Sequence, residues 1–278
     1  MNAVRTADDS SDRLSPSFES YGGAAPSNYE RYFVPVVAAP LAIDLVDAAS
    51  LTPGESVLDL ACGTGVVARV AAERLGPVTI EAADVNPGMI EVARSIDVGP
   101  RIGWHQASAE ALPFADAAFD TVLCQMGLQF FSDKVLALSE ARRVLRAQGR
   151  FLATVPSPIP SLFTILAAQL ERHGQQRAAE FVRQVFSLGD AELEELLDRA
   201  GFADISITAS EKALRLPAPH DFLWQYVTST PLGAVFAELG DTERRDIARD
   251  VVSEWGSFVQ RGSLVIDLRL VLGSAVAP

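Results

Sequence analysis

The sequence has few positively charged residues, only two cysteines and only three histidines. Its 278 residues include 23 Lys or Arg against 36 Asp or Glu, a formal net charge of −13. An acidic surface repels phosphate backbones, so no nucleic-acid partner is expected. Cys62 and Cys124 are the only cysteines, and neither has metal-site spacing to a His or to the other Cys. We predict two reduced thiols and no metal site.

Long apolar runs and targeting segments are also lacking. The longest apolar stretch, 33–46, is interrupted by Pro35, Pro40 and Asp44, and a membrane span needs about 20 apolar residues. Residues 1–12 are polar and acidic, without the apolar centre of a signal peptide. We therefore expect a cytoplasmic protein that does not associate with membranes. Its expected oligomeric state is a monomer or a homodimer. A hydrophobic fraction of 49% with 21% charged residues excludes disorder as the main state.

The first half of the chain alternates strands and helices. Residues 1–28 lack periodicity and predict a flexible lead-in, whereas the apolar spacing over 29–49 predicts one or two helices, divided near Pro40. Strands are predicted at 56–60, 78–83, 101–106, 119–124 and 150–155, and helices at 66–75, 87–93 and 133–145. This alternation predicts an α/β fold with a doubly wound, Rossmann-like, mainly parallel sheet whose core spans 29–155.

The pattern changes after the Pro-rich segment 156–160. Residues 161–188 and 219–260 have helical patterns, and strands are predicted at 203–209 and 264–272. We therefore predict a helical cap inserted in the late part of the sheet. The expected division assigns the cap to 156–189 and 217–262, and the completion of the sheet to 190–216 and 263–278.

A glycine-rich turn follows the first predicted strand. Gly63, Gly65 and Ala68 match G-x-G-x-x-A, and Asp84 comes 19 residues after Gly65, since 84 − 65 = 19. Glycines let the backbone approach a ligand, and a carboxylate on the second strand accepts hydrogen bonds from ribose hydroxyls. This pattern alone fits a nicotinamide dinucleotide. Asp59, inside the first strand, departs from the apolar residues usual there and suits a cationic ligand end or the ordering of the loop.

A wider set of segments resembles the class I S-adenosylmethionine-dependent methyltransferases. The first motif of that family is similar to Val57-Leu58-Asp59-Leu60-Ala61-Cys62-Gly63-Thr64-Gly65, and its second-strand motif is similar to Ala83-Asp84-Val85-Asn86-Pro87-Gly88-Met89. The stretch before the fourth strand resembles Ala109-Glu110-Ala111-Leu112-Pro113-Phe114. Segments 124–131 and 142–146 look like the type 11 small-molecule branch, related to quinone-biosynthesis methyltransferases. The resemblance is strong over 29–155 and loose in the cap.

The resemblance implies S-adenosylmethionine as cofactor and S-adenosylhomocysteine as product. Gly63 and Gly65 would face the methionine part, Asp84 would hold the ribose diol, and Val85 and Met89 would line the adenine. Ser108 stands where many relatives have an Asp that accepts the adenine amino group, and an uncharged acceptor weakens that contact by about 1 kcal/mol. The predicted cofactor-binding set is Tyr32, Asp59, Ala61, Gly63, Gly65, Asp84, Val85, Met89, Ser108, Ala109 and Gln125.

No residue stands out as an acid or base, so we assign no catalytic residue. His105 belongs to the third predicted strand, and His173 and His220 lie in the predicted cap without a recognisable partner, so we expect all three to be surface or structural residues. Methyl transfer by positioning and desolvation is therefore expected, with a small, partly apolar metabolite as acceptor, such as a secondary metabolite. The predicted acceptor pocket is formed by Tyr29, Gln129, Trp224 and Tyr226. The alternatives are a cyclase or lyase that keeps the sulfonium cofactor as a fixed charge, and an NAD(P)-dependent oxidoreductase.

Overall fold

The computed structural model describes residues 16–18, 22–75, 80–96 and 102–278. A single sheet runs through this part of the chain in the order β3-β2-β1-β4-β5-β8-β6, and the short β7 pairs with β8 off this path. Its strands are β1 (Val57–Leu60), β2 (Ile80–Asp84), β3 (Ile102–Gln106), β4 (Phe119–Gln125), β5 (Leu145–Pro156), β6 (Ala203–Leu216), β7 (Val259–Gln260) and β8 (Ser263–Val276). The first five are mutually parallel, and β8 is antiparallel to β5, β6 and β7. The predicted Rossmann-like, mainly parallel sheet is confirmed.

Helices cover both faces of the core sheet. One face packs against α2 (Ala39–Ala49), α3 (Val66–Leu75) and α4 (Pro87–Ser95), and the other against α5 (Lys134–Val144) and α8 (Asp190–Arg199). Asn86 begins α4 by accepting hydrogen bonds from the N–H groups of Gly88 and Met89, and Pro87 occupies the first helical position. Asp133 caps α5 in the same way. These helix starts hold the loops at the carboxyl ends of the strands, where ligands bind in such sheets.

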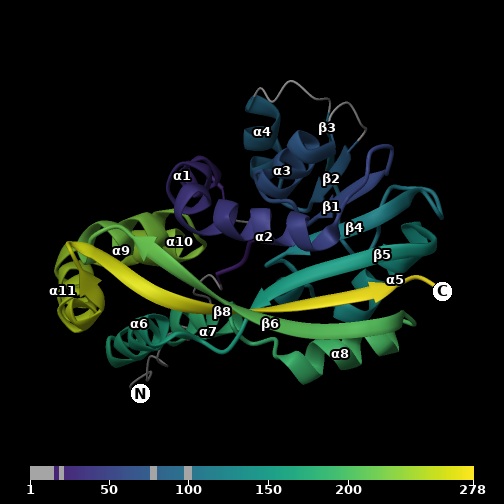
Figure 1. The fold of residues 1–278 in the computed structure, drawn as a ribbon. Helices are drawn as coiled ribbons and strands as arrows, with labels where there is room; N and C mark the ends of the chain where they lie inside the picture. The colour runs from purple at the N-terminus through teal and green to yellow at the C-terminus, as the bar shows by residue number, and fades with distance from the viewer. Residues whose placement is uncertain (1–15, 19–21, 76–79, 97–101) are drawn as a thin grey trace, which may run out of the picture.

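The last two long strands extend past the core sheet into the helical cap. Figure 1 shows β6 and β8 running from beside the C-terminus to the helices α9–α11. Both strands have 14 residues, so the predicted ranges 203–209 and 264–272 were too short. The outer part of β6, with Glu211, Lys212 and Arg215, is polar because only one side of the ribbon packs against the cap. That polarity concealed the strand in the sequence.

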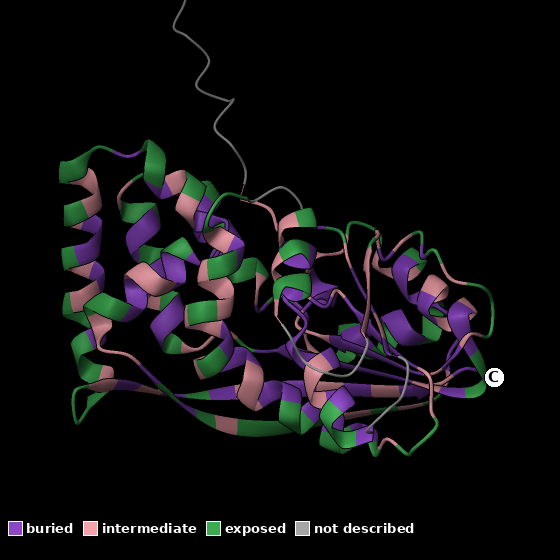
Figure 2. Cartoon of the chain, turned by 90° about the horizontal axis from the view of Figure 1, so that it is seen from above, coloured by how far each residue is buried: buried purple, intermediate pink, exposed green. Residues whose placement is uncertain are grey.

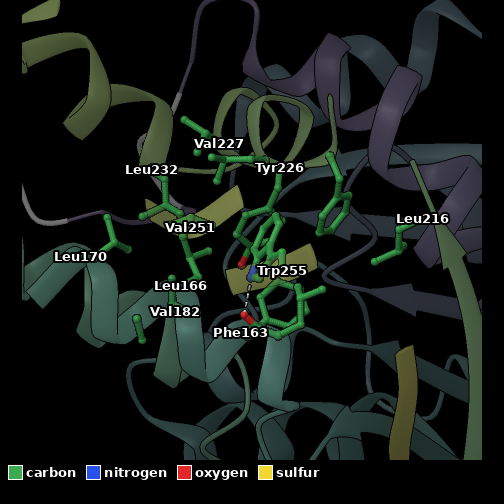
Figure 3. Packing of buried hydrophobic residues seen from close by; sticks show 14 of the residues in the cluster. Phe163, Leu166, Leu170, Val182, Leu216, Tyr226, Val227, Leu232, Val251 and Trp255 are labelled. Carbon is green, nitrogen blue, oxygen red and sulfur yellow. Dashed lines mark hydrogen bonds between the residues drawn. The ribbon is translucent and has the colours of Figure 1, made fainter. Parts of the chain in front are cut away.

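The cap has its own hydrophobic core. The helices of the cap are α6 (Ser161–Arg172), α7 (Gln176–Gln184), α9 (Pro219–Thr228), α10 (Leu232–Glu238) and α11 (Asp241–Trp255). Trp255 is completely buried at its centre and donates a hydrogen bond from Nε1 to the carbonyl of Leu162 at 2.9 Å (Figure 3). The predicted helical segment 219–260 ends early, because β7 turns back onto β8. Seen from above, the cap and the core lie side by side, with exposed residues on their outer helix faces (Figure 2).

One long helical segment precedes β1. It comprises α1 (Ala25–Asn28), the π-helix η2 (Tyr29–Ala38) and α2, without a break at Pro40, which lies in the first turn of α2. The predicted lead-in therefore ends before residue 25, and its residues 1–15 and 19–21 lie outside the described part of the chain. By length and composition, Ala25–Ala49 could cross a membrane, yet 44% of its most apolar window is buried inside the protein. Most of its buried residues pack with β1 and α3, whereas Val37 and Leu41 belong to the hydrophobic core of the cap.

Candidate active site

A cavity opens at the carboxyl ends of β1, β2, β3 and β4, between the core, η2 and the cap. The loops after these four parallel strands meet there, as expected for a ligand site in such a sheet. Most of the predicted site residues line it, namely Tyr29, Asp59, Ala61, Gly63, Asp84, Val85, Met89, Ser108, Ala109, Gln125 and Tyr226. Their roles towards a ligand remain predictions.

The glycine-rich loop forms one wall in a left-handed backbone conformation. Ala61 and Gly63 have φ angles of 56° and 55°. The loop is fixed to β2, because Cys62 N–H donates to the Ala83 carbonyl at 3.0 Å and Gly63 N–H donates to Asp84 Oδ2 at 2.8 Å. A Cβ atom on Gly63 would meet only the Tyr29 ring, at 3.8 Å. The glycine therefore keeps the backbone open towards the cavity.

Asp84 closes the turn between β2 and α4. Its two carboxylate oxygens accept from Gly63 N–H at 2.8 Å and from Asn86 N–H at 2.9 Å. Burial raises the pKa of this carboxyl, and the two backbone hydrogen bonds oppose the rise. Each oxygen retains a second lone pair. Asp84 can therefore accept hydrogen bonds from a pair of ligand hydroxyls in the cavity.

Asp59 carries an unsatisfied buried oxygen. The residue is 1% exposed, and its Oδ2 accepts from Ala68 N–H at 2.9 Å, which ties β1 to the start of α3. Its Oδ1 has no hydrogen-bond partner among the described residues, although the residue lines the cavity. Burial and the nearby Asp84 raise the pKa of Asp59 to about 7, against the lowering effect of Ala68 N–H and Arg69. A buried carboxylate oxygen without a partner requires a cation or a donor, and a ligand in the cavity can supply one.

Ser108 is coupled to Glu110, which the sequence prediction left out of the site. The Ser108 hydroxyl donates to the Glu110 carboxylate. The other Glu110 oxygen accepts from the N–H groups of Ser132 at 3.1 Å and Asp133 at 3.4 Å. Desolvation acts to raise the pKa of Glu110, but these hydrogen bonds lower it overall, so the carboxylate is ionised. Glu110 lies in the segment 109–114 that resembles a motif of the family, so its position in the sequence could have indicated a place in the site.

Gly65 and Tyr32 do not line the cavity. Gly65 has a φ angle of 86°, and a Cβ atom there would lie 2.2 Å from the Trp104 ring. The absence of a side chain at Gly65 leaves room for this ring from β3. On η2, the cavity face is formed by Tyr29 and Phe33, whose rings stack at 5.0 Å. Tyr32 lies on another side of that helix, under the guanidinium of Arg31.

Two of the residues predicted to form the acceptor pocket, Gln129 and Trp224, lie outside the cavity lining. Gln129 is 1% exposed, within the 3-10 turn Leu128–Phe130, and Phe130 from the same turn takes the place at the cavity. Trp224 is turned away on α9, where its Nε1 donates to His220 at 3.3 Å and its ring meets Phe236 edge-on. Tyr226, two residues further on, is the member of α9 that lines the cavity.

Aromatic residues that the sequence prediction missed form much of the remaining lining. Phe18 packs against Phe130 at 4.7 Å and Phe181 at 5.5 Å between ring centroids, and Asn86 Nδ2 donates to its carbonyl at 2.8 Å. Phe33 from η2 also faces the cavity. Nothing in the composition around Phe18 indicates this position, because its place depends on contacts with segments over 60 residues away in the chain.

The Rossmann-like topology, the glycine-rich loop and the second-strand Asp84 define a nucleotide-cofactor enzyme, and comparison with known proteins identifies its class. Residues 57–149 match a family described as "Methyltransferase domain". The ubiquinone/menaquinone biosynthesis C-methyltransferase UbiE of Hahella chejuensis is 42% identical over 112 residues, 38% of this chain and 45% of that protein. The UbiE of Haemophilus ducreyi is 30% identical over 181 residues, 58% of this chain and 69% of that protein. The chain belongs to the class I S-adenosylmethionine-dependent methyltransferases.

Solved structures show the same fold. A methyltransferase of Bacillus halodurans superimposes with a TM-score of 0.58 at 20% identity, covering 85% of this chain and 98% of that chain. Phosphoethanolamine N-methyltransferase 2 of Haemonchus contortus gives 0.57 at 19% identity, covering 91% and 57%. This chain spans less than half the length of the first curated relatives it matches.

Proposed function

We propose that this protein transfers a methyl group from S-adenosylmethionine to a small, partly apolar molecule bound between the core and the cap. The proposal rests chiefly on one observation. A single cavity joins the glycine loop, Asp59 and Asp84 to an aromatic wall that includes Phe33 and Phe130. The first part suits a nucleotide with a cationic end, and the second suits an apolar acceptor.

The residues present fit the cofactor. Asp84 would accept from the ribose hydroxyls, Asp59 Oδ1 would receive the positively charged end, and Val85 and Met89 would contact the adenine. When bound, the cofactor supplies a methyl group activated for attack by its positively charged sulfur. The protein's residues then orient the acceptor and exclude water. In displacement reactions, these two effects can supply a large share of the lowering of the activation barrier.

Among the described lining residues, none that the cofactor would leave free is suited to removing a proton from the acceptor, because Asp59 is assigned to the positively charged end of the cofactor. No His, Lys or Arg is present among the described residues that line the cavity. Burial raises the pKa of the Cys62 thiol well above its usual value, and burial also raises that of the Tyr226 hydroxyl. The carboxylates of Asp84 and Glu110 are engaged by backbone N–H groups. This supports transfer by positioning.

We expect Asp84→Asn to weaken the binding of both S-adenosylmethionine and S-adenosylhomocysteine by about 10- to 100-fold. The variant replaces a charged acceptor of ligand hydrogen bonds, each worth about 1.5–3 kcal/mol. Calorimetric titration of native and variant protein tests this, with NADH as a third ligand. Asp204→Asn is the matched control, because Asp204 is exposed and is not part of the cavity lining. Binding of NADH alone would contradict the proposal.

Turnover distinguishes methyl transfer from the cyclase alternative. The solved [4+2]-cyclase SpnF shares this fold with a TM-score of 0.53 at 22% identity, covering 87% of this chain and 81% of that chain. An apolar cavity without a base also suits a cyclisation driven by a fixed charge. Mass spectrometry of S-adenosylhomocysteine after incubation with an acceptor decides between them. Release of one S-adenosylhomocysteine per product supports the transferase, whereas product formed with intact S-adenosylmethionine supports a cyclase.

A further inference from the structure

We infer that the acceptor is uncharged and that the cavity rejects anionic molecules of the same shape. This inference rests on the proposed function, because it concerns the acceptor end of the same cavity. We call this end the acceptor wall and define it by residues of η2, the end of β4, the cap and Phe18. Its members are Phe18, Phe33, Met126, Phe130, Val185 and Tyr226.

The acceptor wall carries no charge. Its aromatic rings pack against one another, with Phe18 and Phe130 at 4.7 Å and Phe33 and Tyr226 at 6.5 Å between centroids. Tyr226 is 4% exposed, and burial raises the pKa of its hydroxyl, which therefore stays protonated. The neighbouring Thr230 hydroxyl donates to the Tyr226 carbonyl at 2.9 Å. The hydroxyl groups of Tyr226 and Thr230, which both line the cavity on this side, are therefore neutral.

All the charged side chains in the described part of the cavity lining are acids. Asp59, Asp84 and Glu110 line the cavity, and the described lining holds no cationic side chain. Among basic residues near the glycine loop, Arg69 is engaged elsewhere, since it donates to the Thr64 carbonyl and pairs with Glu30 at 2.8 Å. The unpartnered Oδ1 of Asp59 adds a buried negative site within the lining.

The uncharged acceptor wall and the acidic residues of the cavity lining together disfavour the binding of an anionic acceptor. A carboxylate or phosphate placed against the acceptor wall would lose its hydration without gaining a partner. It would also be repelled by the carboxylates across the cavity, whose effect is strong in a region of low dielectric constant. An uncharged aromatic molecule meets neither penalty and gains contact with the rings.

The test compares uncharged and anionic ligands on one ring system. The binding of 2-naphthol, 2-naphthoate and 2-naphthyl phosphate is measured by calorimetry at pH 7.5, with and without saturating S-adenosylhomocysteine. We expect 2-naphthol to bind at least ~50-fold more tightly than either anion. The inference is overturned if 2-naphthoate binds as tightly as 2-naphthol, or if 2-naphthol does not bind.

A positive charge placed on the acceptor wall should weaken the selection against anions. Val185→Lys is expected to narrow the gap between 2-naphthol and 2-naphthoate at least ~10-fold, because it supplies the missing cation. Val259→Lys is the control, since Val259 is exposed on β7 and lies outside the cavity. An unchanged gap in Val185→Lys counts against the inference. Binding of S-adenosylhomocysteine by each protein is recorded separately, and its absence from the native protein would overturn the proposed function instead.

Discussion

Asp59→Asn is expected to stabilise the ligand-free protein at pH 8 while weakening its cofactor binding. Burial raises the pKa of Asp59 to about 7 in the folded chain, whereas an unfolded Asp titrates near 3.9. Between these values the native state binds more protons than the unfolded state, so the free energy of unfolding falls as pH rises through this window. The ionised group then costs at most about 4 kcal/mol above pH 7, at ~1.4 kcal/mol per pKa unit. Asn does not ionise, so the variant avoids this loss.

Urea unfolding at pH 4.5 and pH 8 measures the effect. The variant should gain stability over the native protein at pH 8 and little at pH 4.5, while the exposed Asp204→Asn control should differ little from the native protein at both. Binding of S-adenosylmethionine should weaken below pH 7 in the native protein, by up to ~10-fold per pH unit, because Asp59 must lose its proton to receive a cation. A native binding curve that is flat from pH 5 to 8 would refute this role for Asp59.

Gly65→Ala is expected to destabilise the protein by about 2–4 kcal/mol. The φ angle of 86° strains any residue with a side chain, and the new Cβ atom would lie 2.2 Å from the Trp104 ring. The backbone conformation costs about 1 kcal/mol and the overpacking a further ~1–3 kcal/mol. Chemical denaturation gives the difference in unfolding free energy.

Gly54→Ala is the matched control for this steric effect. Gly54 has a similar φ angle of 95°, but a Cβ atom added there would meet no other atom within 4 Å. The control should therefore show only the backbone cost of about 1 kcal/mol. Trimming the ring with Trp104→Leu in the Gly65→Ala background should recover part of the lost stability. Equal losses at Gly54 and Gly65 would mean that the contact with Trp104 is unimportant.

The cofactor end of the site could be predicted because its residues follow their strands directly. Asp59, Gly63 and Asp84 lie at or beside the ends of β1 and β2, and parallel pairing of those strands brings them together. Gly65 fits the same motif, yet its environment is set by Trp104 on β3. A motif specifies neighbours along the chain, and the packing partner of Gly65 is not among them.

The acceptor end depends on contacts that no local pattern encodes. Tyr29 and Tyr32 are three residues apart in the same π-helix, yet Tyr29 lines the cavity and Tyr32 does not. Tyr226 and Trp224 lie on different sides of α9, so that Tyr226 lines the cavity whereas Trp224 packs against Phe236. Phe18 comes from a stretch without periodicity and is held by Asn86 on a distant element.

The continuity of β6 and β8 between core and cap also limits how this enzyme can be recombined. The two strands pair from Ala203 with Val276 to Leu216 with Leu264 as one ribbon, so the cap is not a detachable module joined by linkers. A chimaera that takes only 156–189 and 217–262 from a relative would place foreign helices on a native ribbon. Exchange of acceptor preference between relatives therefore requires crossover points inside both strands, chosen so that their register is kept.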